Sequence, residues 1–205
     1  MTAAGARRTQ ADRRARSRNA LLEAAARGLS AYGYANLSLE RVAADAGYSR
    51  GALYHQFADK EDLTLAVIRW VDETWHAEVG RLADEEPDAA RALLVLARGH
   101  AVYCRRDIAR VMTTLQVEFS GQYHPVAQAL AETLGPLVAD CAARIAAGRR
   151  DGVIPDGPPA HETALAYLGA VEAVVIQLAG RAPVDAELAE RAVRGVLGLP
   201  PATRA

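Results

Sequence analysis

The chain has 205 residues, of which 51% are hydrophobic and 24% are charged, and its formal net charge is −1. This length suffices to bury a substantial core in one or two domains. The many alanines and the few aromatic residues favour an all-α fold. No uninterrupted apolar run approaches the roughly 20 residues of a membrane-spanning helix, so we expect no association with a membrane.

The small net charge hides two segments of opposite sign. Residues 1–60 carry ten basic and five acidic side chains, whereas residues 61–205 carry fourteen basic and twenty acidic ones. A basic N-terminal part followed by an acidic remainder indicates an N-terminal nucleic-acid-binding region attached to a region with another function.

The first 18 residues contain six arginines and one acid, Asp12. We interpret them as a disordered arm, which is either a solubilising tail or a segment that attracts DNA phosphates. No apolar segment follows the arginines, so we expect no signal peptide. Cys104 and Cys141 are therefore expected to be reduced thiols in a cytoplasmic protein.

The first part of the chain predicts three helices and the start of a fourth. Residues 19–31 form the first helix, with an apolar stripe of leucine and alanine. Ser38 and Ser49 are suited to cap two short helices, because a serine hydroxyl accepts hydrogen bonds from the N–H groups of a first turn. Gly47 suits a left-handed helix end, and Asp59 is suited to cap the next helix.

Two short helices joined by a glycine-containing turn are typical of a helix-turn-helix, whose second helix enters the major groove of DNA. Leu53 and Phe57 are predicted to face the core, which leaves polar residues on the outer face. The alternative is an ordinary helical hairpin with a solvated face. The candidate DNA-binding residues are Ser38, Ser49, Arg50, Gly51, Ala52, Tyr54, His55 and Lys60.

Residues 38–63 closely resemble the DNA-binding signature of the TetR (tetracycline-repressor-like) family of bacterial transcription regulators. The resemblance extends backward through the preceding helix, whereas the rest of the chain resembles the family only in length and helical character. The matching residues are Ala43, Ala44, Gly47, Tyr48, Ser49, Gly51, Leu53, Tyr54, Phe57, Lys60, Glu61, Asp62 and Leu63.

This resemblance implies an all-α protein with an N-terminal three-helix DNA-binding domain over residues 1–62. It implies a C-terminal helical domain for ligand binding and dimerisation over residues 63–205. The implied partners are a double-stranded DNA operator, an unknown small-molecule effector and a second copy of the chain bound through the last two helices.

The C-terminal part is predicted to be helical throughout. A long helix over residues 59–83 links it to the DNA-binding part. Pro136 is expected to kink or split its helix, because proline lacks an N–H group. Asp185 is expected to cap the last helix. The helices between are predicted at residues 87–104, 107–119, 125–148 and 161–180.

The helix at residues 161–180 is apolar around most of its circumference, so it must be buried on more than one side. Together with the amphipathic last helix it suits a four-helix interface between two subunits, in which Val175 and Val193 lie in the apolar seam. The alternative is a thick core within one protomer.

Polar and aromatic residues on otherwise apolar helices are the candidates for a ligand pocket. The alternative for each is an ordinary core or interface residue, because buried polar groups are usually hydrogen-bonded within the protein. Glu172 is costly to bury unless paired, either with a cationic ligand or with Arg181 or Arg194 of a second subunit. The candidates are Trp75, His100, Tyr103, Met112, Gln116, Phe119, Tyr123, Tyr167, Glu172 and Gln177.

The sequence contains no nucleophile–base pair, metal-ligand spacing or phosphate-binding loop that we recognise, so we expect neither an enzyme nor a cofactor. The prediction is a homodimeric repressor that a small molecule releases from a palindromic operator. The alternatives are a constitutive DNA-binding protein without an effector and a helical interaction module.

Overall fold

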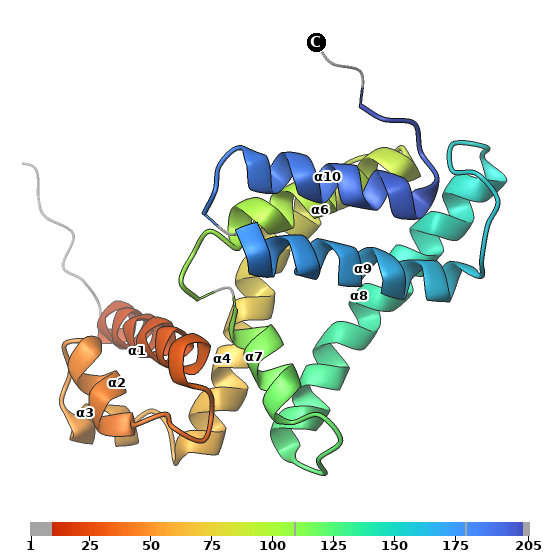
Figure 1. Cartoon of the computed structure of the whole chain (residues 1–205). Coiled ribbons are helices and arrows are strands. Elements are labelled where there is room, and N and C mark those ends of the chain that lie inside the picture. The colour runs from red at the N-terminus through yellow and green to blue at the C-terminus, as the bar shows by residue number, and fades with distance from the viewer. Residues whose placement is uncertain (1–9, 109, 179, 203–205) are drawn as a thin grey trace, which may run out of the picture.

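The computed structural model describes residues 10–108, 110–178 and 180–202, and every regular element in these residues is a helix (Figure 1). This confirms the predicted all-α class. No helix in these segments combines the length and apolar character needed to cross a membrane. The helices are α1 (Gln10–Tyr32), α2 (Leu39–Asp45), α3 (Arg50–Tyr54), α4 (Lys60–Trp75), the π-helix η1 (His76–Gly80), α5 (Arg81–Asp84), α6 (Ala89–Tyr103), α7 (Val111–Glu118), α8 (Pro125–Arg150), α9 (Ala160–Leu178) and α10 (Val184–Leu197).

Helices α2 and α3 begin and end as the capping residues predict. The Ser38 hydroxyl accepts a hydrogen bond from the N–H of Arg41, and the Ser49 hydroxyl accepts one from the N–H of Ala52. Gly47 has a φ of +76°, a left-handed conformation that a side chain would strain. The turn between the helices is therefore set by local sequence.

Helix α1 begins nine residues earlier than predicted. Residues 10–18 continue the helix instead of forming a disordered arm. Arginine and alanine have high helix propensity, and Asp12 lies in the first turn, where the helix dipole favours negative charge. Arg7 and Arg8 lie outside the described residues.

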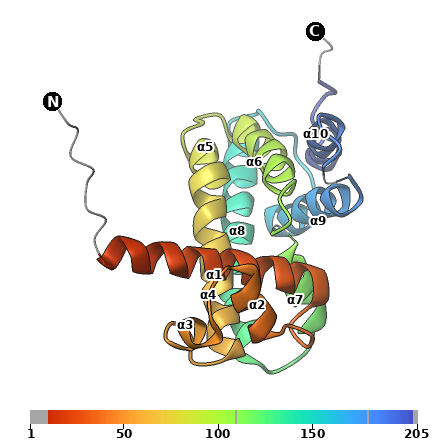
Figure 2. The same cartoon turned by 90° about the vertical axis from the view of Figure 1, so that its left-hand side faces the viewer.

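Helices α4, η1 and α5 form the long helical segment predicted for residues 59–83, which runs from the N-terminal helices α1–α3 to the C-terminal helices (Figures 1 and 2). It is interrupted by the π-helical turn at His76–Gly80. A Cβ atom at residue 80 would lie 2.6 Å from Nδ1 of His76, so glycine leaves room for the His76 ring in this turn.

Two hydrophobic cores lie along this segment. The first joins α1–α3 and α4 with α7 and the first turns of α8. The second joins η1 and α5 with α6, α8, α9 and α10. We keep residues 1–62 and 63–205 as the proposed domains, and the first core extends across that boundary.

Three details of the C-terminal helices differ from prediction. Helix α7 begins at Val111 instead of Asp107. Pro136 does not split α8, because Gly135 and Pro136 lie on an exposed face, where water can satisfy the carbonyl group that proline leaves free. The N-cap of α10 is Pro183, and the fully buried Asp185 instead pairs with Arg105.

Candidate DNA-binding surface and effector cavity

The outer face of α3 carries the exposed polar residues that the sequence predicts. Arg50, Tyr54 and His55 are exposed, whereas Leu53 and Phe57 are buried in the first core. The Arg50 guanidinium lies 3.0 Å from the Glu40 carboxylate and 5.3 Å from the centre of the Tyr54 ring. This exposed ion pair is weak, so Arg50 can exchange Glu40 for a DNA phosphate at little cost.

Neither a positive φ nor a close contact within the described residues requires glycine at position 51. A Cβ atom there would have the Ser49 hydroxyl as its nearest neighbour, at 3.8 Å. The open space above it suits close approach of another molecule to the α3 backbone. Of the other candidates, Ser38 and Ser49 use their hydroxyls as helix caps, and Ala52 is half-buried.

Lys60 occupies a different position from the one expected of a phosphate contact. Its ammonium group donates hydrogen bonds to the carbonyl oxygens of Tyr34 (2.9 Å) and Ala35 (3.3 Å). It also lies 4.5 Å from the centre of the Tyr34 ring. The charge is thus directed into the loop between α1 and α2 rather than toward solvent.

Sequence reasoning missed Arg41 as a surface cation near this face. It is exposed on α2, and its guanidinium lies 5.1 Å from the centre of the Tyr32 ring. The helical extension of α1 adds Arg13 and Arg14 as exposed cations. The excess of basic charge in residues 1–60 was the available signal.

The C-terminal part contains a cavity of about 930 Å³ between α4, η1, α6, α7, α8 and α9. Its volume falls in the range of small-molecule sites. Its walls include residues of every helix around it, so it could not be located from one stretch of sequence. Seven candidate ligand residues line it: Trp75, His100, Tyr103, Met112, Gln116, Tyr167 and Glu172.

Three other candidates lie elsewhere. Phe119 is buried in the first core, where its ring packs edge-on against Tyr34 at 5.1 Å. Tyr123 is fully exposed in the loop after α7, and Gln177 is exposed on α9. Their aromatic or polar character could not reveal which side of the helix or loop faces the cavity.

Glu172 is the centre of a polar network on the cavity wall. One carboxylate oxygen lies 3.1 Å from Nε2 of His100, and the other accepts a hydrogen bond from Thr113 at 3.0 Å. The indole N–H of Trp75 donates to Nδ1 of His100 at 2.9 Å. No arginine of the same protomer pairs with Glu172 within the described residues, where Arg194 binds Glu190, and the pairing with an arginine of a second subunit stays a prediction.

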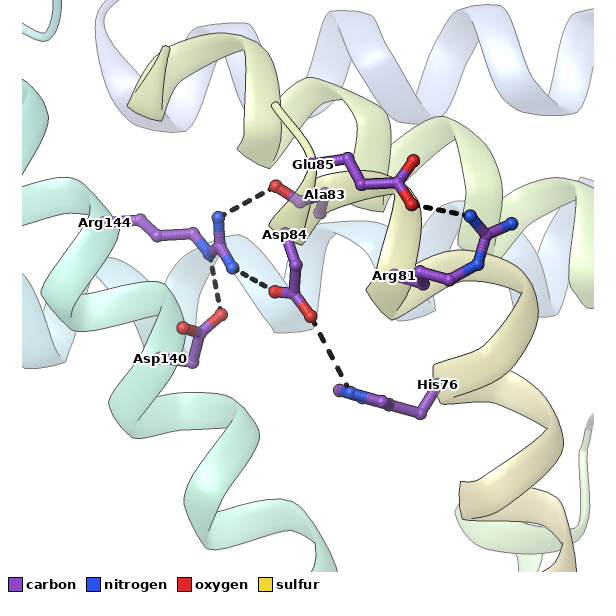
Figure 3. Close-up of polar contacts among 7 residues, drawn as sticks. All are labelled: His76, Arg81, Ala83, Asp84, Glu85, Asp140 and Arg144. Carbon is purple, nitrogen blue, oxygen red and sulfur yellow. Dashed lines mark hydrogen bonds and ion pairs between the residues drawn. The ribbon is translucent and has the colours of Figure 1, made fainter. Parts of the chain in front are cut away.

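A second network joins η1 and α5 to α8 at the edge of the cavity (Figure 3). The Arg144 guanidinium contacts the carboxylates of Asp84 (2.6 Å) and Asp140 (2.7 Å) and donates to the carbonyl of Ala83 at 3.1 Å. His76 lies 3.7 Å from Asp84, on the side of Asp84 opposite to Arg144 (Figure 3). The positive charge of Arg144 is therefore shared between two acids.

Helix α7 contacts both the cavity and the candidate DNA-binding domain. Thr113 at its cavity end holds Glu172, and Glu118 at its other end holds the loop after α1. The Glu118 carboxylate accepts hydrogen bonds from the N–H groups of Tyr34 (2.6 Å) and Ala35 (2.7 Å). Lys60 binds the carbonyls of the same two residues, so this loop is held from two sides.

Residues 21–67 match the model of the family described as "Bacterial regulatory proteins, tetR family". Over 58 residues the chain is 41% identical to the HTH-type transcriptional repressor AcnR of Corynebacterium glutamicum, an alignment that covers 28% of this chain and 31% of the relative. The chain spans less than half the length of the curated relatives it matches.

Solved structures share the fold over nearly the whole chain. AibR, in complex with isovaleryl coenzyme A and operator DNA, superimposes with a TM-score of 0.75 at 19% identity, covering 88% of this chain and 98% of AibR. SCO4454, a TetR-family regulator of Streptomyces coelicolor, gives 0.72 at 22% identity and covers 90% and 95%. The chain therefore resembles TetR-family regulators in sequence over residues 21–67 and shares the fold of these solved structures over most of its length.

Proposed function

We propose that the protein is a homodimeric transcriptional repressor that binds a palindromic DNA operator and is released by a small molecule. The observation that carries the proposal is that α4 and α7 each contact both the candidate DNA-binding domain and the cavity. The names of the relatives as transcription regulators support it. We place it in the cytoplasm and assign it no enzymatic activity or cofactor.

The proposed DNA interface is the outer face of α3, with Arg50, Gly51, Tyr54 and His55 in the major groove. Ser38, Ser49 and Ala52 supply backbone and cap groups at the edge of this face. Lys60 supports the interface from within, through the loop after α1. Arg41 is added here as a phosphate contact.

The proposed dimer forms through α9 and α10, at the end of the molecule opposite α3 (Figures 1 and 2). Leu165 and Ile176 on α9 and Val184 and Leu188 on α10 are exposed apolar residues. Val175 and Val193 are buried within the protomer instead, so they do not form the seam. Burial of the exposed residues against a second copy would remove apolar surface from water.

In the proposed mechanism, a ligand in the cavity moves α4 and α7 and so changes the spacing of the two recognition helices. A dimer with the wrong spacing loses contacts at one half-site. To lower operator occupancy about a hundredfold, the ligand must bind the mis-spaced state about 2.7 kcal/mol more tightly.

The direct test is selection of DNA from a random pool by the purified protein. We expect an enriched palindrome with half-sites about 34–36 Å apart or a small multiple of this distance. A thermal-shift screen then finds cavity ligands, and each is tested for release of the selected operator. The absence of any enriched sequence would contradict the proposal.

A further inference from the structure

We infer that the effector is an organic cation with an apolar body, and that Glu172 is its counter-ion. The inference rests on the proposed function only in treating the cavity as the effector site. It is carried by the charge and hydrogen bonding of the cavity wall.

The Glu172 carboxylate lies at the cavity with 38% of its side chain exposed. Its two contacts within the described residues come from His100 and Thr113, and no lysine or arginine of these residues pairs with it. Burial alone would raise the pKa of Glu172, but the hydrogen bonds from His100 and Thr113 outweigh burial and hold this pKa below its usual value of 4.5. The carboxylate is therefore ionised at neutral pH. Each oxygen retains a lone pair for another donor.

The His100 ring does not neutralise this charge. An indole N–H can only donate, so Nδ1 of His100, which lies 2.9 Å from the Trp75 nitrogen, must present a lone pair. The proton of the neutral ring is then on Nε2, toward Glu172. Burial lowers the pKa of His100, whereas Cys104 and Glu172 would raise it to about 10. The Trp75 contact favours the neutral ring. An imidazolium would carry a proton on Nδ1 that points at the indole N–H, which can only donate.

The rest of the lining adds to the negative charge. Arg144 is one of two arginines on the wall, and Asp84 and Asp140 already share it. The lining holds one other arginine, Arg69, and three further acids: Asp72, Glu132 and Glu172. A carboxylate or phosphate ligand would meet an excess of like charge, whereas a cation would not.

The remaining walls suit an apolar body. Leucine, isoleucine and valine side chains of α4, α6, α8 and α9 line the cavity. The Trp75 and Tyr103 rings line the cavity, Trp75 is linked to Glu172 through His100, and aromatic rings attract cations. A primary amine can donate hydrogen bonds to Glu172 while its alkyl chain fills the apolar part.

The test measures binding of decylamine, decanol and decanoate to the purified full-length chain by calorimetry, below the aggregation concentration of each compound. We expect decylamine to bind at least about tenfold more tightly than the other two. Glu172→Gln should remove this preference and leave decanol binding unchanged, and Glu172→Asp should keep it. Glu162→Gln is the matched control on the same helix, because Glu162 is exposed and does not line the cavity, and it should change decylamine affinity less than about twofold.

The ranking of the three probes on the unmodified chain is decisive even if Glu172→Gln fails to fold. Tighter binding of decanoate or decanol, equal binding of all three, or no decylamine binding would overturn the inference. If decanoate releases the selected operator and decylamine does not, the inference of a cationic effector is wrong, but the proposed repressor function is still supported. Tight decylamine binding without any effect on operator affinity would support the cation site and contradict the proposed regulation.

Discussion

Arg50 and Lys60 carry the same charge on the same domain, but their surroundings differ. The Arg50 side chain is mostly exposed and pairs with the exposed Glu40. The Lys60 ammonium is half-buried and binds two carbonyl oxygens of the loop after α1. Arg50 can exchange its exposed partner for a DNA phosphate, whereas Lys60 would have to give up both hydrogen bonds to do so.

We predict that Arg50→Ala weakens operator binding and lowers the slope of log affinity against log salt by about one, because one phosphate contact is lost. Lys60→Met should leave this slope unchanged and lower the free energy of unfolding by about 1–3 kcal/mol, since two backbone carbonyls lose a charged donor. Fluorescence anisotropy over a salt series and urea denaturation measure the two effects. A lowered slope with unchanged stability for Lys60→Met would restore its phosphate contact.

Ionised carboxylates in the C-terminal domain make stability depend on pH. Hydrogen bonds from Arg105 lower the pKa of Asp185 below its usual value of 3.8. Burial raises the pKa of Glu190, but its bonds from Arg98 and Arg194 lower it below 4.5 overall. Because both folded values lie below the unfolded ones, the stabilisation is present above about pH 4.5 and is lost as the pH falls through the folded values.

We therefore predict that the free energy of unfolding falls between about pH 5 and pH 3, as carboxylates that are paired in the folded protein become protonated. Asp185→Asn should make this dependence shallower and should lower the melting temperature at pH 7, because Arg105 loses its bidentate partner. Asp156→Asn, in the exposed loop after α8, is the control and should change neither quantity. Urea titrations at each pH measure the effect, and an unchanged dependence for Asp185→Asn would count against this pair.

At the scale of the elements, two helical paths connect the cavity to the candidate DNA-binding domain. The rod of α4, η1 and α5 passes the cavity at Trp75 and includes a π-helical turn there, a feature frequent at functional sites. Helix α7 is the second path, because Thr113 binds Glu172 and Glu118 binds the loop after α1. A ligand that draws Glu172 away from Thr113 therefore acts on α7 directly.

We predict that Glu118→Gln weakens the coupling between the two sites. An amide has one oxygen, so it can satisfy only one of the N–H groups of Tyr34 and Ala35 well. The ratio of operator dissociation constants with and without the effector should move several-fold toward one, while effector affinity in the absence of DNA stays within about twofold. Calorimetry and anisotropy give both values.

Glu73→Gln, on the exposed side of α4, is the matched control for this prediction and should keep the full ratio. If Glu118→Gln also keeps the ratio, coupling runs through the α4 rod alone.

At the scale of the whole molecule, the candidate DNA-binding face and the unpartnered face of α9 and α10 lie at opposite ends (Figures 1 and 2). Gly195 on α10 is exposed and has open space beside it. A small residue at such a position permits close approach of two helices. A dimer formed there would place its two α3 helices far apart, as two half-sites of one operator require.

We predict that Ile176→Glu combined with Leu188→Glu gives a folded monomer, because both side chains are exposed in the protomer and would place unpaired charges in the dimer seam. Sedimentation velocity measures the oligomeric state, and circular dichroism checks the fold. Operator affinity should fall by at least tenfold, since a monomer contacts one half-site. Val117→Glu, at an exposed apolar residue on α7, should remain dimeric. A dimer that survives the double substitution would place the interface elsewhere.

The sequence by itself determined the features that depend on near neighbours in the chain. Serine and aspartate caps, Gly47 and the helical spacing of Leu53 and Phe57 act within a few residues, so the helix-turn-helix and its outer face were predicted correctly. Seven of the ten candidate pocket residues also line the cavity, because a polar or aromatic side chain on an apolar helix needs a polar partner or a ligand.

Only the tertiary structure decided the role of side chains whose partners are distant in the chain. Lys60 binds carbonyls 25 and 26 residues away, Phe119 packs on Tyr34, and Asp185 pairs with Arg105 across 80 residues. The same holds for Glu172, whose neutral partners come from α6 and α7. The physical reason is that the charge state and the direction of a long side chain follow from the groups packed around it, and helix periodicity does not specify which helix supplies them.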